Sequence, residues 1–332
     1  MVAIKDIRAA NELIADGTAP RIAVFVGGTS GIGQLTIKAL VTTGARVRIY
    51  LVGRKSSEDR SKTFIEEMHT VNPKAEIIWT EAEVSLLGET KRVCETIKTK
   101  EPHVDLLFLT TGYAPFCKRQ ETSEGIEESL SLSYYTRILF IMHLLPLLRK
   151  ADAPRVVAVL GGGLERLNSL QLDDLELKKP ENWSGRKAQS QNTTINTVAM
   201  DKLAGDNPDV TFIHSWPGWV DTGNVKRGQE NGSLTSWIFR LLVEPLVATI
   251  SFRLEDSGQR HLFQCTSALY GGRGVPWNSK PGINVNLEAG TGLFLVNPWG
   301  DCTPNNKNIV QLREKATETV WEHTQELLRP YL

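Results

Sequence analysis

A glycine-rich turn at residues 27–33 is the part of this sequence whose residue types and spacing best suit a chemical role. It reads Gly-Gly-Thr-Ser-Gly-Ile-Gly, follows the apolar run Ile22 to Val26, and precedes residues 34–41, whose apolar side chains recur at helical spacing. A strand, tight turn and helix in this order bring backbone N–H groups and the positive end of a helix dipole to one point, which suits a pyrophosphate. Side chains in place of the glycines would obstruct the turn or the phosphate. The pattern predicts a nucleotide site formed by Gly27, Thr29, Ser30, Gly31, Ile32 and Gly33; the alternative is a glycine turn that holds no ligand.

A basic pair, Arg54 and Lys55, bears on which nucleotide would bind. It follows a predicted second strand at residues 46–52, and Arg54 lies 21 residues after Gly33. In nucleotide-binding sheets an acidic residue near this position holds the ribose 2′-hydroxyl, whereas arginine accommodates a 2′-phosphate. Because a guanidinium pairs well with phosphate, the pair favours NADP(H) over NAD(H). The alternative is a solvated basic pair on the surface.

Strands and helices are predicted to alternate along the rest of the chain. Further strands are expected at residues 76–80, 104–110, 155–160, 210–214 and 292–296, and helices at 64–72, 86–99, 125–148, 193–203 and 309–328. This alternation implies parallel pairing, right-handed crossovers and helices on both faces of the sheet. The predicted fold is an α/β doubly wound parallel sheet, Rossmann-like, in a single domain over residues 21–332. An amphipathic helix is expected within residues 1–20.

Composition excludes several classes of function. The 38 basic and 38 acidic residues balance, which argues against binding to nucleic acid or an anionic membrane. The four cysteines are widely spaced, so they suit a reducing compartment and form neither a disulfide framework nor a zinc site. The charged N-terminus does not read as a signal peptide, and a cytoplasmic protein without a metal is expected.

Residues 234–252 form the most hydrophobic segment of the sequence. Arg240 and Glu244 lie in its middle, and charges there are costly inside a bilayer, so a membrane span is not expected. We instead expect residues 223–260 to form a lid over a pocket for a small hydrophobic substrate, or a subunit contact in a homodimer.

Several ordered motifs give the chain a resemblance to a known family. Residues 26–33 are similar to the T-G-x-x-x-G-x-G turn of the short-chain dehydrogenase/reductase family, with valine replacing the threonine. Gly53-Arg54 resembles the NADP-preferring end of its second strand, and Glu83-Val84 lies where the family has Asp-Val beside the adenine. Residues 217–222 match its P-G-x-x-x-T stretch, which holds the nicotinamide end. The chain looks most like the larger, retinol-dehydrogenase-like fungal members. The resemblance implies cofactor contacts from Val84, Gly112, Pro217, Gly218, Val220 and Thr222.

The family's catalytic residues do not carry over to this sequence. Its N-N-A-G stretch appears as Leu109-Thr110-Thr111-Gly112, its helical asparagine falls on Ser133, and its serine falls on Gly161. Its tyrosine and lysine fall on Gln189 and Thr193. A second register places residues 183–187 there; it keeps a lysine, Lys187, but no tyrosine, and it lengthens the following helix beyond expectation.

Loss of the tyrosine removes the family's proton donor. Neither an amide nor a threonine hydroxyl exchanges a proton readily near pH 7, so another residue would have to do so. Tyr113 is the first candidate, because it follows the fourth strand; the others are Tyr134, Tyr135 and His214, and Arg137 is a candidate to bind an oxygen of the substrate. Three functions remain open: an NADP(H)-dependent redox enzyme, a non-redox cyclase, isomerase or dehydratase, and a non-catalytic nucleotide-binding protein.

Overall fold

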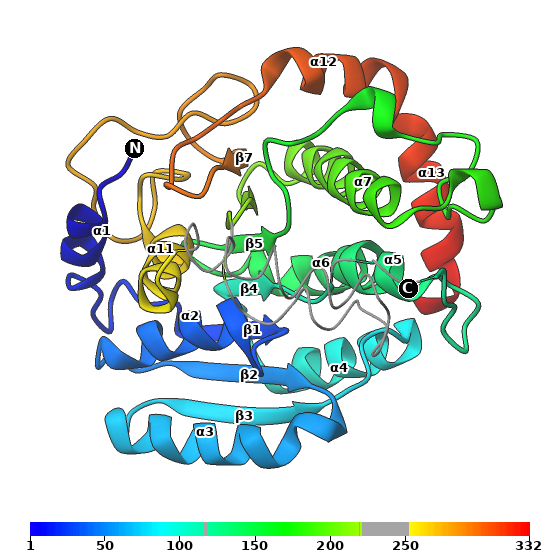
Figure 1. The fold of residues 1–332 in the computed structure, drawn as a ribbon. Helices are drawn as coiled ribbons and strands as arrows, with labels where there is room; N and C mark the ends of the chain where they lie inside the picture. The colour runs from blue at the N-terminus through cyan, green and yellow to red at the C-terminus, as the bar shows by residue number, and fades with distance from the viewer. Residues whose placement is uncertain (114, 116–117, 219, 221–251) are drawn as a thin grey trace, which may run out of the picture.

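The computed structural model describes residues 1–113, 115, 118–218, 220 and 252–332. Within them, seven strands form one sheet in the order β3-β2-β1-β4-β5-β6-β7, and every neighbouring pair is parallel (Figure 1). The strands are β1 (Ile22–Val26), β2 (Arg48–Gly53), β3 (Glu76–Glu81), β4 (Leu106–Leu109), β5 (Arg155–Val159), β6 (Thr211–Ser215) and β7 (Gly292–Val296). The predicted doubly wound α/β sheet is confirmed.

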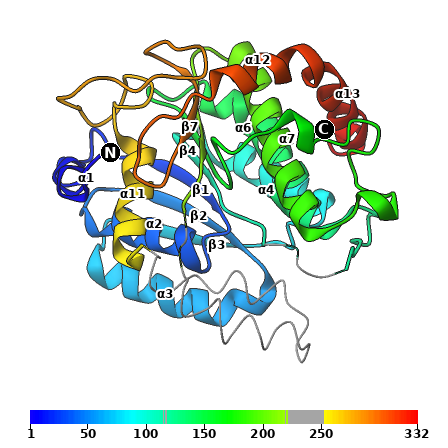
Figure 2. The same cartoon turned by 45° about the horizontal axis from the view of Figure 1, so that its top comes forward.

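Helices cover both faces of the sheet. One face carries α1 (Ile4–Asn11), α2 (Gly31–Thr42), α3 (Glu58–Val71) and α11 (Leu254–Thr266). The other carries α4 (Leu87–Lys100), α6 (Thr136–Leu148), α7 (Gly185–Asp206), α12 (Asn306–Lys315) and α13 (Thr317–Leu328). Both views show α12 and α13 alongside α7 (Figures 1 and 2).

The strands are apolar throughout because both of their faces are buried. Along β1, Val24 and Val26 belong to the core beneath α4, α6 and α7, whereas Ala23 and Phe25 face α2 and α11. Phe25 packs against Phe108 of β4 with ring centroids 5.0 Å apart. Continuous apolar runs of this kind are typical of parallel sheets covered on two sides.

One long helical segment crosses the back of the sheet and contains a local irregularity. It begins with α5 (Glu128–Leu130), widens into the π-helical turn η2 (Ser131–Tyr135), and continues as α6. Residues Glu128–Leu148 are long and apolar enough to cross a membrane, but 83% of their apolar window is buried in the fold. This segment is therefore a core helix.

Several predicted helix boundaries were wrong. Helix α7 begins at Gly185 and not at residue 193, with the Ser184 hydroxyl capping the backbone N–H of Lys187 at 3.2 Å. Its early turns bury polar residues, including Gln191 and Asn192, so no apolar periodicity marks them. Helix α3 begins at Glu58 and not at residue 64. Its first turn is acidic and solvated, so no apolar periodicity marks it.

Most of the expected lid or subunit-contact segment lies outside the described residues, up to residue 251. Its last part, from Leu254 onward, forms the start of α11. There α11 packs closely on α2, since a β-carbon at Gly258 would lie 2.7 Å from the carbonyl oxygen of Leu35.

Candidate functional site

The predicted site residues gather at the carboxyl edge of the sheet. From β1 the chain passes to β2 and β3 on one side, whereas β4 to β7 lie on the other, so the strand order reverses between β1 and β4. Ligands of open parallel sheets bind outside the strand ends at such a reversal. The glycine turn follows β1, Arg54 follows β2, Gly112 follows β4, Gly161 follows β5 and Pro217 follows β6.

The glycine turn requires its glycines. Gly27 has φ +94°, and a β-carbon there would lie 2.7 Å from Thr110 Oγ1, the hydroxyl that donates to the Gly27 carbonyl at 3.0 Å. Gly31 begins α2 with φ +59°, where a side chain is strained. A β-carbon at Gly33 would lie 2.6 Å from the carbonyl oxygen of Gly27. The first-turn N–H groups of α2 have no partner within the helix, and this packing places them at the edge where a phosphate would bind.

The basic pair lies beside this turn. A β-carbon at Gly53 would lie 2.3 Å from Cγ2 of Thr29, so the end of β2 packs directly on the turn. Arg54 and Lys55 come next and are exposed. Neither forms a salt bridge with any residue the structure describes.

Val84 lies in the loop after β3 and is buried. Its carbonyl accepts a hydrogen bond from Thr136 Oγ1, and the Ser85 carbonyl accepts one from Ser131 Oγ at 2.6 Å. The loop expected beside the adenine is thus fixed to η2 and α6. Thr222 lies outside the described residues, whereas Val220 lies within them and is half-buried.

Gly112 and Ser133 meet at the end of β4. Gly112 has φ +128°, and a β-carbon there would lie 2.5 Å from Ser133 Oγ. Ser133 belongs to η2, and its carbonyl accepts a hydrogen bond from Nδ2 of Asn196 at 2.7 Å. The two residues predicted from separate motifs therefore share one corner of the site.

Gly161 and Thr193 also lie in contact. A β-carbon at Gly161 would lie 2.7 Å from Thr193 Oγ1 and 2.8 Å from its Cγ2, so Thr193 occupies the space a serine side chain would need. Gln189 lies one turn earlier on α7 and is half-buried. The two candidate side chains of α7 are therefore both neutral: the amide of Gln189 and the hydroxyl of Thr193.

The structure bears on the second register, which aligns residues 183–187 with the family's tyrosine and lysine. The observed length of α7 removes the objection that it makes the helix too long. However, Lys187 Nζ donates to the Glu181 carbonyl at 2.7 Å in an exposed position. Its ammonium is therefore engaged at the surface, outside the group formed by Gly161 and Thr193.

Among the replacement tyrosines, Tyr113 alone follows a strand end. It is half-buried, and its hydroxyl donates to Oε2 of Glu128 at 3.1 Å. Tyr134 instead hydrogen-bonds Thr324 of α13 at 2.6 Å, and Tyr135 hydrogen-bonds His323 of α13 at 2.7 Å. Burial raises the pKa of both helix tyrosines, so neither is a proton donor near neutral pH.

His214 lies in a buried network behind the loop that follows β5. Its Nε2 accepts from the Gly161 N–H at 3.2 Å, so Nδ1 carries the proton and donates to Thr197 Oγ1 at 2.6 Å. Thr197 donates to Oε1 of Glu165 at 2.7 Å, and the Gly163 N–H donates to the same oxygen at 2.8 Å. Burial lowers the pKa of His214 to about 3, so it is neutral and positions Gly161. The sequence reading missed Glu165, because one carboxylate after a glycine loop carries no motif.

Loss of stability at mildly acidic pH follows from this histidine. Because its folded pKa lies below the value of about 6.5 in the unfolded chain, its stabilising contribution is present above pH 6.5 and is lost as pH falls toward 3. We expect protonation of His214 in the unfolded chain to lower the free energy of unfolding by about 2 kcal/mol at pH 5 relative to pH 8. Urea unfolding of the wild type and of His214→Gln at both pH values measures this. If both proteins lose the same free energy of unfolding between pH 8 and pH 5, this expectation is wrong.

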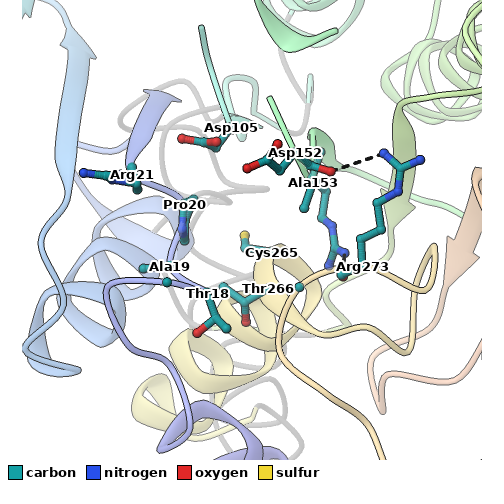
Figure 3. A pocket seen from close by; sticks show the side chains of 13 residues that line it. Thr18, Ala19, Pro20, Arg21, Asp105, Asp152, Ala153, Cys265, Thr266 and Arg273 are labelled. Carbon is teal, nitrogen blue, oxygen red and sulfur yellow. Dashed lines mark hydrogen bonds between the residues drawn. The ribbon is translucent and has the colours of Figure 1, made fainter. Parts of the chain in front are cut away.

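A separate hollow of about 270 Å³ opens at the amino edge of the sheet (Figure 3). Two of its charged side chains have partners: Asp105 accepts the Ile22 N–H at 2.8 Å, and Arg273 Nη1 donates to the Asp152 carbonyl at 3.2 Å. Burial raises the pKa of the Cys265 thiol, so that cysteine stays protonated. The hollow lies at the end of the sheet opposite the glycine turn, and these side chains serve the fold.

Comparison with known proteins agrees with this geometry. The profile of the short chain dehydrogenase family matches residues 21–162, from β1 to the glycine loop after β5. Oxidoreductase AN1596 of Emericella nidulans is 36% identical over 99% of this chain and 98% of its own length. The NmrA-like family domain-containing oxidoreductase notO of an Aspergillus species is 33% identical over 98% of this chain and 94% of its own. The crystal structure of L-sorbose reductase from Gluconobacter frateurii, complexed with NADPH and L-sorbose, superposes with a TM-score of 0.55 at 14% identity. The superposition covers 76% of this chain and 92% of the reductase.

Proposed function

Because this chain belongs to the short-chain dehydrogenase/reductase family, we propose that it is an NADP(H)-dependent oxidoreductase acting on a small hydrophobic carbonyl compound or alcohol. The observation that carries the proposal is the glycine turn at the reversal of strand order, with the exposed Arg54 beside it. The departures at Gly161, Gln189 and Thr193 support a specialised substrate, and we place the reaction in secondary metabolism.

The cofactor proposal rests on charge at the end of β2. Arg54 is an exposed guanidinium without a protein partner among the described residues, next to the turn that would hold the pyrophosphate. A 2′-phosphate at this position would gain a charge-assisted, bidentate contact. The bound NADPH of L-sorbose reductase, on a similar fold, is compatible with this choice.

Replacing Arg54 by alanine is expected to remove the preference for NADPH over NADH. Loss of a charged phosphate contact lowers the NADPH affinity roughly 10- to 150-fold and leaves the NADH affinity nearly unchanged. Calorimetric titration of the folded variant with both nucleotides measures this. Arg46→Ala is the matched control, since it removes an exposed arginine before the other end of β2. A wild type that prefers NADH would refute the proposed role of Arg54.

The proton in this proposal comes from Tyr113. A bound nicotinamide supplies or accepts the hydride, and the chain must then move one proton to or from the substrate oxygen. Tyr113 leaves the end of β4, and its hydroxyl is hydrogen-bonded to the Glu128 carboxylate. In reduction, the Tyr113 hydroxyl gives its proton to the substrate oxygen and regains one from Glu128 in its acid form, which takes up a proton from solvent; oxidation of an alcohol runs these steps in reverse. Thr193 and Gln189 would orient that oxygen.

The first experiment on the function is a test of hydride transfer. Purified protein is mixed with NADPH and a panel of hydrophobic ketones, aldehydes and quinones, and separately with NADP⁺ and the corresponding alcohols. A change in absorbance of the reduced nicotinamide that depends on both substrate and protein supports the proposal. NADPH binding without any turnover across the panel would favour the second candidate function.

One observation favours a non-redox enzyme as that second candidate. Thr193 fills the space beside Gly161, and both candidate groups on α7 are neutral. Such a site suits a cyclase, isomerase or dehydratase, which accelerates its reaction by positioning and fixed dipoles. Turnover of a substrate that continues unchanged after removal of nucleotide would establish this reading over the redox one.

A further inference from the structure

Arg137 is a buried cation beneath the carboxyl edge of β4 and β5. It comes from α6 and is 1% exposed. Its Nη1 donates to the Val159 carbonyl at 3.0 Å, and its Nη2 donates to the carbonyl of Thr111. A β-carbon at Gly112 would lie 3.8 Å from Nη2. The guanidinium therefore lies directly under the chain as it leaves both strands.

This charge has no counter-ion in the part of the chain that the structure describes. Arg137 forms no salt bridge there, its Nε has no hydrogen-bond partner, and burial alone lowers its pKa to about 9. Its positive charge also lowers the pKa of His214 in β6, although burial lowers it more. A buried cation is costly unless it is paired. Two carbonyl dipoles offset only part of that cost.

A second buried arginine shows what a purely structural role looks like. Arg155 begins β5 at the opposite edge of the sheet and also lacks a carboxylate partner among the described residues. Its guanidinium donates to four carbonyls, those of Gln264, Ser267, Tyr270 and Arg273, at 2.8–2.9 Å. These bonds clamp the turn after α11 to the sheet. Arg137 has half as many acceptors and lies beneath the edge where a ligand would bind.

We propose that Arg137 makes the site bind the reduced form of the nicotinamide cofactor more tightly than the oxidised form. The inference rests on the proposed function, because Gly112, which lies next to the guanidinium, is one of the expected cofactor contacts. The oxidised ring carries a positive charge that the reduced ring lacks, and a fixed cation in a poorly solvated site repels it. The same charge stabilises the negative charge that a carbonyl oxygen gains on reduction.

The test compares the dissociation constants of NADPH and NADP⁺ in four proteins. Wild type and Arg137→Lys should bind NADPH about tenfold more tightly than NADP⁺, as expected for a charge about 10 Å away at an effective dielectric constant of about 20. Arg137→Met should bring the ratio close to one. Arg155→Met, the matched control, should lose stability and keep the wild-type ratio. The ratio is insensitive to a partly unfolded fraction, because both nucleotides need the same folded protein.

The outcomes separate this inference from the proposed function. Equal binding of the two nucleotides by the wild type overturns the role of Arg137 even if Arg137→Met does not fold. A folded Arg137→Met with the wild-type ratio also overturns it and leaves the cofactor assignment intact. A wild type that binds neither nucleotide overturns the proposed cofactor, and the role of Arg137 with it.

Discussion

Replacement of Gly31 by valine is expected to abolish NADPH binding. Gly31 begins α2 with φ +59°, and the N–H groups that follow it are those that would bind the pyrophosphate. A branched side chain both strains this backbone and occupies the space of the phosphate. Losing two charge-assisted hydrogen bonds costs about 3–6 kcal/mol, or roughly 10²–10⁴-fold in affinity. Calorimetric titration of the folded variant with NADPH measures the loss.

The control for this substitution is Gly44→Val. Gly44 has φ +78° and lies just beyond the other end of α2, where a β-carbon would have no atom of the described chain within 4 Å. Valine there strains the backbone in a similar way without approaching the site, so stability should fall by about 1–3 kcal/mol while NADPH affinity is kept. If Gly44→Val loses the nucleotide equally, the effect of Gly31→Val reflects general destabilisation, and the turn is not the phosphate site.

Replacement of Tyr113 by phenylalanine is expected to reduce turnover by about 10²–10⁴-fold with little change in NADPH affinity. Phenylalanine keeps the ring and removes the hydroxyl that donates to Glu128, so the site loses its proton donor. Steady-state rates with the best substrate of the hydride-transfer panel measure the effect. Glu128→Gln, which keeps a hydrogen-bond acceptor and removes the carboxylate, should also slow turnover.

Tyr134→Phe is the matched control for the tyrosine. Its hydroxyl contacts Thr324 of α13, so its loss should cost about 0.5–1.5 kcal/mol of stability and leave the rate unchanged. Turnover that survives Tyr113→Phe and disappears with Lys187→Met would contradict our placement of the proton donor. It would also show that the second register of α7 is the right one.

The fold was predictable where one physical signal dominates. Strand β1 is apolar on both faces and followed by glycines that no other residue can replace, so its position was predicted to the residue. The predicted helix at α7 was too short, because the first turns of α7 bury polar groups. One of them is Gln191, whose partner is the carbonyl of Leu175 in a separate loop. Hydrophobic periodicity does not predict the burial of polar residues whose hydrogen-bond partners lie elsewhere in the sequence.

The site was predictable only in part, for the same reason. Glycine and arginine at fixed spacings indicated the phosphate turn, because that chemistry is local in sequence. The contact of Gly161 with Thr193 and the chain of hydrogen bonds from Glu165 to His214 join the loop after β5 to α7 and β6. The burial of Arg137 without a counter-ion among the described residues depends on three elements meeting, and no stretch of sequence displays it.

The attachment of α13 to η2 has a consequence for how this protein is made. Tyr134 and Tyr135 flank Ser133 and are held by Thr324 and His323, which follow them by 190 and 188 residues. The ribosome must therefore synthesise α13 before this part of the site can be completed. Until then the nascent chain leaves Tyr134, Tyr135 and the surface of α7 that contacts α13 uncovered, and chaperones bind apolar surfaces of this kind. Deletion of α13 should accordingly lower the yield of active protein more than deletion of α1, although α13 is remote from the glycine turn in sequence.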